Sequence, residues 1–222
     1  MVYVVIRTVL GALFRMLWRP VVEGVEYIPR EGAVIVASNH LSFIDSIVIP
    51  LAVPRRRVTF LAKSEYFTTG GLLGLPRRTL FRGMGAVPID RSAARDACAA
   101  LDTALQVLSR GWAFGIYPEG TRSRDGRLYR GRTGIGWLAL EAGVPVVPVG
   151  LTGTDRVQPV GARVPRIHRV HLRFGEPIRP ETYAGCGPAQ ARRQLTDDVM
   201  DAIAVLSGQQ RAAGYNTHAV DA

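Results

Sequence analysis

Lysine is nearly absent from this chain of 222 residues, because Lys63 is the only lysine among 28 basic residues and the rest are arginines. Acidic residues number only 18, which leaves a net charge of +10. Such a charge favours anionic partners, namely nucleic acid, anionic lipid or a phosphorylated substrate. Nucleic acid is disfavoured as a partner, because the aromatic residues, 8% of the chain, do not alternate with arginines as base-stacking side chains do.

Cysteine is also scarce, since Cys98 and Cys186 lie far apart and no C-x-x-C motif occurs. This pattern excludes a disulfide framework and a cysteine-based zinc site, and a reducing cytosol is the simplest compartment. Clusters of histidine and carboxylate residues with metal-ligand spacing are missing too, apart from one His–Asp pair described below. We therefore expect no metal and no bound cofactor.

The first twenty residues lack a long apolar run, although most of their side chains are apolar. Their longest charge-free run covers residues 8–14, which is too short for a bilayer that needs about 20 apolar residues. No small-residue cleavage site follows, which argues against a secretory signal. On a helical projection, Arg7, Arg15 and Arg19 gather on one arc of an apolar helix. We expect residues 1–20 to lie in a membrane interface with these arginines toward anionic head groups; the alternative is a helix docked on the protein's own core.

Short apolar runs alternate with helical patterns over the rest of the chain. Apolar fraction and length fit one globular domain, which we place at residues 21–206, followed by a flexible C-terminal tail over 207–222. The alternation predicts an α/β fold with a central mixed, mainly parallel sheet flanked by helices. The expected strands cover residues 33–37, 58–62, 86–89, 112–117, 146–151 and 170–174, and the expected helices cover 43–52, 92–110, 134–142 and 188–206.

A histidine and an aspartate follow the first of these strands, in the stretch SNHLSFIDS over residues 38–46. His40 and Asp45 are five residues apart, so they can meet only if His40 lies on the loop and Asp45 in the first helical turn. A neutral imidazole held by a carboxylate is well suited to remove a proton near pH 7. The chain offers no obvious nucleophile of its own nearby, which suggests that the substrate's hydroxyl loses the proton. The alternative is a capping box, in which Ser42 and Asp45 only begin a helix.

A second polar segment, residues 118–134, carries five arginines and four glycines. Arginine side chains and exposed backbone N–H groups are common ligands of phosphate. No Walker spacing occurs, so nucleotide hydrolysis is unsupported. Glu119 at the start of this segment either orients Arg122 or accepts a hydrogen bond from a substrate hydroxyl; the alternative is a solvated basic loop with Glu119 as its surface counter-ion.

Four blocks of the sequence resemble the glycerolipid acyltransferase family. NHLSFID over residues 39–45 is similar to its N-H-x-x-x-x-D block, and GAVPIDR, YPEGTRS and VPVVPVG at residues 85–91, 117–123 and 144–150 are similar to the other three, in the same order. Within the family, the likeness is to the bacterial 1-acylglycerol-3-phosphate acyltransferases. Tyr117 stands where phenylalanine is more common, and Pro88 where a bulky apolar residue is usual.

The resemblance implies transfer of a fatty acyl group from acyl-CoA or acyl carrier protein to the 2-hydroxyl of lysophosphatidate, at the cytoplasmic face of the cell membrane. It implies that His40 is the general base and Asp45 its partner. The positions that it implies for binding the glycerol phosphate are Lys63, Arg91, Glu119, Gly120, Thr121 and Arg122. Other acceptors, namely another lyso-lipid or glycerol-3-phosphate, stay open, and so does a non-catalytic basic membrane-binding protein.

Overall fold

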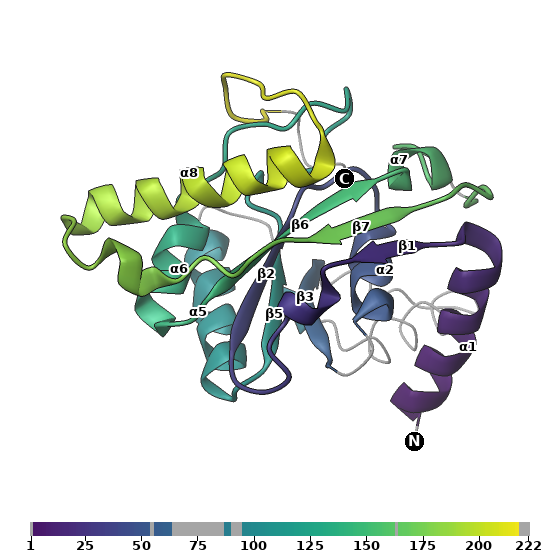
Figure 1. Cartoon of the computed structure of the whole chain (residues 1–222), viewed down its shortest axis with the longest axis horizontal. Helices are drawn as coiled ribbons and strands as arrows, with labels where there is room; N and C mark the ends of the chain where they lie inside the picture. Colours follow the sequence, from purple (N-terminus) through teal and green to yellow (C-terminus); the bar gives the residue numbers. More distant parts are fainter. Residues whose placement is uncertain (1, 54–55, 64–86, 90–94, 163, 218–222) are drawn as a thin grey trace.

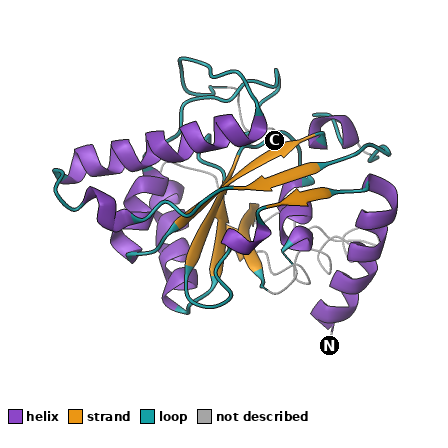
Figure 2. Cartoon of the chain, in the orientation of Figure 1, coloured by secondary structure: helices purple, strands orange, loops and turns teal. Residues whose placement is uncertain are grey.

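The structure, a computed structural model, describes residues 2–53, 56–63, 87–89, 95–162 and 164–217. A single mixed sheet lies between two layers of helices, as Figures 1 and 2 show. The sheet order is β1-β7-β6-β2-β5-β3-β4. Its strands are β1 (Val21–Glu23), β2 (Val34–Ser38), β3 (Val58–Lys63), β4 (Val87–Ile89), β5 (Ala113–Ile116), β6 (Val146–Thr152) and β7 (His171–Phe174). Neighbouring strands run parallel except β6 and β7, so the expected mixed, mainly parallel sheet is confirmed.

Helices pack on both faces of this sheet. They are α1 (Val2–Trp18), α2 (Asp45–Ala52), α5 (Arg95–Ser109), α6 (Gly134–Ala142), the single turn α7 (Thr154–Val157) and α8 (Pro188–Ser207). The predicted bounds of α6 are confirmed, and the other predicted helices end within three residues of their expected limits. The short strand β1 was not predicted, because its three residues are half-buried or exposed and show no apolar run.

The core forms two clusters, one on each face of the sheet. Alternate residues of β2 point to opposite faces, as the pleat of a strand requires: Val34 and Val36 belong to one cluster, and Ile35 and Ala37 to the other. The first cluster packs under α1 and α2, and the second under α5, α6 and α8. A strand buried on both faces explains why residues 33–37 read as a continuous apolar run.

Close packing of α8 depends on glycine at two contact points. A Cβ on Gly150 of β6 would lie 2.4 Å from the backbone carbon of Leu206, and one on Gly136 of α6 would lie 2.2 Å from the Arg192 carbonyl oxygen. Both distances are far below van der Waals contact, so only glycine lets α8 approach the sheet and α6 this closely. The C-terminal end of α8 therefore lies directly against β6.

Helix α1 packs on the rest of the protein through Arg7 as well as through apolar side chains. Phe14 is buried, and the Arg7 guanidinium donates hydrogen bonds to the carbonyls of Val53 and Arg56, the latter at 3.2 Å. The prediction that Arg7 faces lipid head groups is therefore wrong: the carbonyl of Val53, the residue that follows α2, attracts the cation instead. The solvent-facing side of α1 carries Val9 and Met16, which are 54% and 65% exposed.

Residues 208–217 form an ordered segment, which we call the C-terminal strap. Leu128 donates its N–H to the Gln210 carbonyl and accepts from the N–H of Ala212, and Asn216 is buried to 1% exposure. In Figure 1 this yellow segment runs beside the teal loop above the end of α8. The expected flexible tail is thus wrong as far as residue 217, because backbone hydrogen bonds to a distant loop hold it; residues 218–222 lie outside the described part of the chain.

Candidate functional site

The catalytic candidates gather where parallel strands end. Strands β2, β5 and β6 run in the same direction, so the loops that follow them emerge at one edge of the sheet. His40 comes two residues after β2, and Glu119 three residues after β5. The shared edge brings these two loops into contact, as the sequence predicted.

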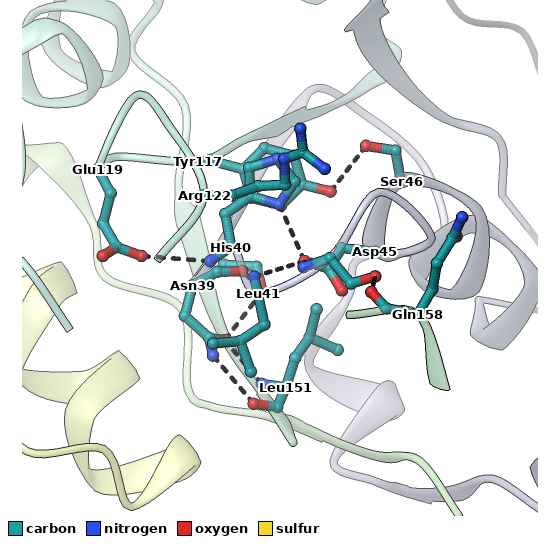
Figure 3. Close-up of polar contacts among 12 residues, drawn as sticks. Asn39, His40, Leu41, Asp45, Ser46, Tyr117, Glu119, Arg122, Leu151 and Gln158 are labelled. Carbon is teal, nitrogen blue, oxygen red and sulfur yellow. Dashed lines mark hydrogen bonds and ion pairs between the residues drawn. The ribbon is translucent and has the colours of Figure 1, made fainter. Parts of the chain in front are cut away.

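His40 and Asp45 form the pair that the sequence predicted (Figure 3). The Nδ1 atom of His40 lies 2.9 Å from Oδ2 of Asp45. The same carboxylate oxygen accepts the backbone N–H groups of Leu41 at 2.7 Å and Ser42 at 2.8 Å. Asp45 is fully buried, whereas the His40 side chain keeps 17% of its surface exposed. With Nδ1 turned to the carboxylate, the other ring nitrogen, Nε2, is the one that a substrate can reach.

The capping-box alternative is realised only in part. Asp45 does reach back to the N–H of Ser42, but the Ser42 hydroxyl donates to the Gln158 carbonyl at 2.7 Å and caps no helix. Oδ1 of Asp45 has no hydrogen-bond partner among the described residues, although the atom is buried. Because both backbone bonds and the imidazole converge on Oδ2, the carboxylate does more than begin α2.

Tyr117 fixes the plane of the His40 ring. The two rings stack with centroids 3.8 Å apart and an angle of 8° between their planes. The Tyr117 hydroxyl and the Ser46 hydroxyl are 2.8 Å apart, which ties the ring to α2. Burial, with a smaller effect of the Asp45 charge, raises the pKa of Tyr117 well above its usual value, so the hydroxyl stays neutral. The imidazole is thus held at its edge by Asp45 and on its face by Tyr117.

Asn39, which precedes the histidine, is a positioning residue that sequence reasoning missed. Its amide is fully buried and exchanges two hydrogen bonds with the backbone of Leu151: Nδ2 donates to the carbonyl at 2.9 Å, and the Leu151 N–H donates to Oδ1 at 2.8 Å. Nδ2 also donates to Oε1 of Gln209 at 2.7 Å. The asparagine therefore ties the loop after β2 to the end of β6. The signal available in the sequence was an amide residue directly before the histidine.

Glu119 is buried to 1% exposure, so the alternative of a surface counter-ion is wrong. Its Oε1 accepts the backbone N–H of His40 at 3.2 Å, and its Oε2 accepts that of Tyr129 at 2.9 Å. Burial raises the pKa of Glu119 to about 7, and the two N–H bonds oppose that rise. The carboxylate thus links the loop between β2 and α2 to residues 118–134. We call residues 39–44 the histidine loop and residues 118–134 the arginine loop.

The other predicted phosphate ligands lie on or near the arginine loop. Gly120 has a φ of +82°, in the left-handed region, and a Cβ there would lie 2.9 Å from Nε of Arg132. Thr121 and Arg122 are half-buried, and the Arg122 carbonyl accepts the side-chain N–H of Asn216 at 3.1 Å. The N–H of Ser123 donates to the His40 carbonyl at 2.8 Å, so Arg122 and His40 belong to directly bonded loops.

One predicted ligand, Lys63, lies on a neighbouring strand. Lys63 is the last residue of β3, where its backbone is paired with Ile89 of β4. Because β3 runs parallel to β5 and β2, Lys63 lies at the edge of the sheet where those strands also end, as expected. Arg91 lies outside the described residues. Within the described part of the chain, no group of three or more histidine, cysteine and acidic residues is placed to hold a metal ion.

This arrangement is suited to removing a proton from a hydroxyl. A buried carboxylate orients one histidine, a stacked ring holds that histidine, and a glycine-containing loop with arginines lies directly beside it. The carboxylate stabilises the imidazolium that forms when the other nitrogen takes a proton. The neighbouring loop is suited to an anionic substrate.

The family model described as Acyltransferase matches residues 19–152. This is more than half of the chain, and the chain belongs to that family. The matched region contains every residue that we predicted for catalysis or substrate binding.

Similar proteins and one solved structure support the same family. The chain is 32% identical over 142 residues to "1-acyl-sn-glycerol-3-phosphate acyltransferase LPAT1, chloroplastic" of Arabidopsis thaliana, across 64% of this chain and 38% of that protein. It is 31% identical over 136 residues to the 1-acyl-sn-glycerol-3-phosphate acyltransferase of Borreliella burgdorferi, across 61% of this chain and 52% of that protein. The crystal structure of the LPA acyltransferase PlsC from Thermotoga maritima matches with a TM-score of 0.71 and 29% identity, across 92% of this chain and 79% of that one. The chain thus spans about half or less of the length of these two curated relatives.

Proposed function

We propose that this protein transfers a fatty acyl group from an acyl thioester to the 2-hydroxyl of lysophosphatidate and so produces phosphatidate. The observation that carries this proposal is the His40–Asp45 pair, in which a buried carboxylate holds Nδ1 and leaves Nε2 for a hydroxyl proton. The names of the similar proteins support lysophosphatidate as the acceptor.

The reaction then follows from the geometry. Nε2 of His40 takes the proton of the acceptor hydroxyl while its oxygen attacks the thioester carbonyl carbon. The tetrahedral intermediate collapses, the carbon–sulfur bond breaks, and the imidazolium returns its proton to the leaving thiolate. Asp45 stabilises the imidazolium, and Tyr117 keeps the ring from turning away. Arg122, with Lys63 and Arg91, binds the acceptor phosphate by charge.

The proposal is tested by thiol release from a long-chain acyl-CoA, measured with and without lysophosphatidate, in the wild type and in His40→Ala. Release that requires lysophosphatidate, yields phosphatidate and disappears in the variant supports the assignment. Release without an acceptor would indicate a thioesterase and overturn it. Parallel reactions with acyl carrier protein as donor, and with glycerol-3-phosphate and other lyso-lipids as acceptors, identify the preferred pair; phosphatidate formation slower than every alternative product would contradict the proposed acceptor.

We further propose that α1 rests on the cytoplasmic surface of an anionic membrane, where the acceptor lipid resides. Its outward face carries Val9, Leu13 and Met16, all more than 40% exposed, with Arg15 and Arg19 exposed beside them. An exposed apolar stripe flanked by arginines is suited to the boundary between acyl chains and anionic head groups. No helix in the described residues is long and apolar enough to cross a membrane.

A vesicle flotation experiment tests this surface. Met16→Glu should reduce binding to phosphatidylglycerol-containing vesicles, because a charge enters the apolar stripe. Val205→Glu is the matched control, since Val205 is 82% exposed but lies on α8. Equal binding of both variants and the wild type would exclude α1 as the lipid contact.

A further inference from the structure

The C-terminal strap lies against the arginine loop, although the two are far apart in sequence. Beside the paired bonds of Leu128, the N–H of Arg130 donates to the Gly214 carbonyl at 2.9 Å. The guanidinium groups of Arg130 and Arg132 lie 5.3 and 5.8 Å from the centre of the Tyr215 ring. Backbone pairing and two cation–π contacts therefore hold the middle of the arginine loop to the strap.

Asn216 connects the strap to the residue that we expect to bind phosphate. Its Nδ2 donates to the Arg122 carbonyl at 3.1 Å, and the asparagine is 1% exposed between exposed neighbours, Tyr215 and Thr217. A buried amide is costly unless it is hydrogen-bonded, so its position here is specific. The bond fixes the backbone from which the Arg122 side chain starts.

Gln209 connects the strap to the histidine loop. Its Oε1 accepts from Nδ2 of Asn39 at 2.7 Å, and its own Nε2 donates to the Gly126 carbonyl of the arginine loop at 2.7 Å. One side chain thus bridges the residue next to His40 and the arginine loop. Gln209, Gly126 and Leu41 also line one hollow of about 380 Å³, so the strap forms part of the wall beside the site.

We propose that the C-terminal strap is the positioning element of the acceptor-phosphate site: Gln209 and Asn216 set Arg122 and the arginine loop relative to His40. The strap lies beyond residues 19–152, the region that matches the family model, so the matched region alone leaves the site without these two links. This inference rests on the proposed function for the identity of the acceptor, but the positioning itself is a property of the fold.

Single substitutions test the kinetic consequence. Loss of one buried hydrogen bond of about 1 kcal/mol corresponds to roughly a 5-fold change, so Asn216→Ala, which loses the bond to Arg122, should raise the KM for lysophosphatidate about 5-fold. Gln209→Ala loses two bonds and should raise this KM at least as much. The KM for the thioester donor should stay within about 2-fold, because the phosphate site alone is displaced. Thr217→Ala and Gln210→Ala are matched controls, since both side chains are exposed neighbours on the same strap.

An acceptor without a phosphate separates positioning from general damage. The rate with monoacylglycerol should fall much less in Asn216→Ala than the rate with lysophosphatidate, so the preference for lysophosphatidate falls. Equal loss with both acceptors, or an unchanged preference, would overturn a role in phosphate positioning.

Hydrogen exchange of the intact protein tests the positioning independently of any activity. The amides of Ser123, Leu128 and Tyr129 should exchange faster in Gln209→Ala and Asn216→Ala than in the two controls, while β2 and β6 keep their protection. Unchanged exchange in the arginine loop would overturn the proposal. A wild type that is inactive on lysophosphatidate but shows these exchange differences would instead refute the proposed acceptor and leave the strap's positioning role standing.

Discussion

The region that matches the family model and the region that follows it divide the work of the site differently. Residues 19–152 carry the reactive and charged side chains, and these occur in recognisable blocks. The later region, from α7 to the strap, contributes mostly backbone bonds, amide side chains and the packing of α8. The comparison teaches that chemistry can be recognised from short motifs, whereas the relative placement of those motifs depends on residues that carry no motif.

The largest effect is expected from a change in the first region that keeps its shape. Asp45→Asn retains the volume of the side chain but favours the wrong histidine tautomer, so kcat should fall roughly 10²–10⁴-fold. The melting temperature and the KM of the acceptor should change little by comparison. Asp102→Asn on α5 is the control, because Asp102 is exposed and belongs to none of the four motifs. A kcat within about 3-fold of the wild type would contradict the role of Asp45.

The contact between the second region and the first, where α8 packs on α6, should be sensitive to packing rather than to charge. Gly136→Ala places a methyl group against the Arg192 carbonyl and should cost about 1–3 kcal/mol of unfolding free energy, although every motif residue is intact. For a chain of this size each kcal/mol lowers Tm by about 2–4 °C, which calorimetry resolves. Gly185→Ala is the control, because a Cβ at Gly185 meets nothing within 4 Å. Equal melting of the two variants would show that α6 and α8 can separate without cost.

Glu119 joins the two loops of the first region and should give a pH signature. Its pKa of about 7 in the folded state exceeds the ordinary value of 4.5, so between these values the folded protein holds a proton that the unfolded chain has lost. Stability from this group therefore decreases as pH rises from about 4.5 to 7, by at most about 1.4 kcal/mol per pH unit. Glu119→Gln should remove this slope in denaturant titrations at several pH values, and an unchanged slope would assign it to another group.

The smallest effect is expected from removing the Tyr117 hydroxyl, because the ring of Tyr117, and not its hydroxyl, holds the imidazole of His40. Tyr117→Phe keeps the stack on His40 and loses only the bond to Ser46, so kcat should fall by less than about 5-fold. Tyr117→Leu removes the stack and should lower kcat further with a weaker effect on the donor KM. Equal rates for the Phe and Leu variants would show that the stack is not needed to hold the imidazole.

The sequence predicted the parallel strands and the His40–Asp45 pair because apolar runs and motif order survive without knowledge of distant contacts. It did not predict that Arg7 docks α1 on α2, since the Val53 carbonyl that binds the cation is 46 residues away. The strap was mistaken for a flexible tail for the same reason: SGQQRAAGY over residues 207–215 has no apolar period, and its order comes from hydrogen bonds to loops 80 or more residues earlier. Of the site, the contact between His40 and Asp45 was predictable, and most of the contacts that position the two loops were not.

The link between Asn39 and Gln209 spans 170 residues of sequence. During synthesis on the ribosome, the histidine loop is made long before Gln209. The loop can therefore reach its final geometry only after residue 209 has been added. Contacts of such long sequence separation form late, because they close the largest loops of the chain. Catalytic competence should therefore be among the last properties that a newly made molecule acquires, after its sheet has already assembled.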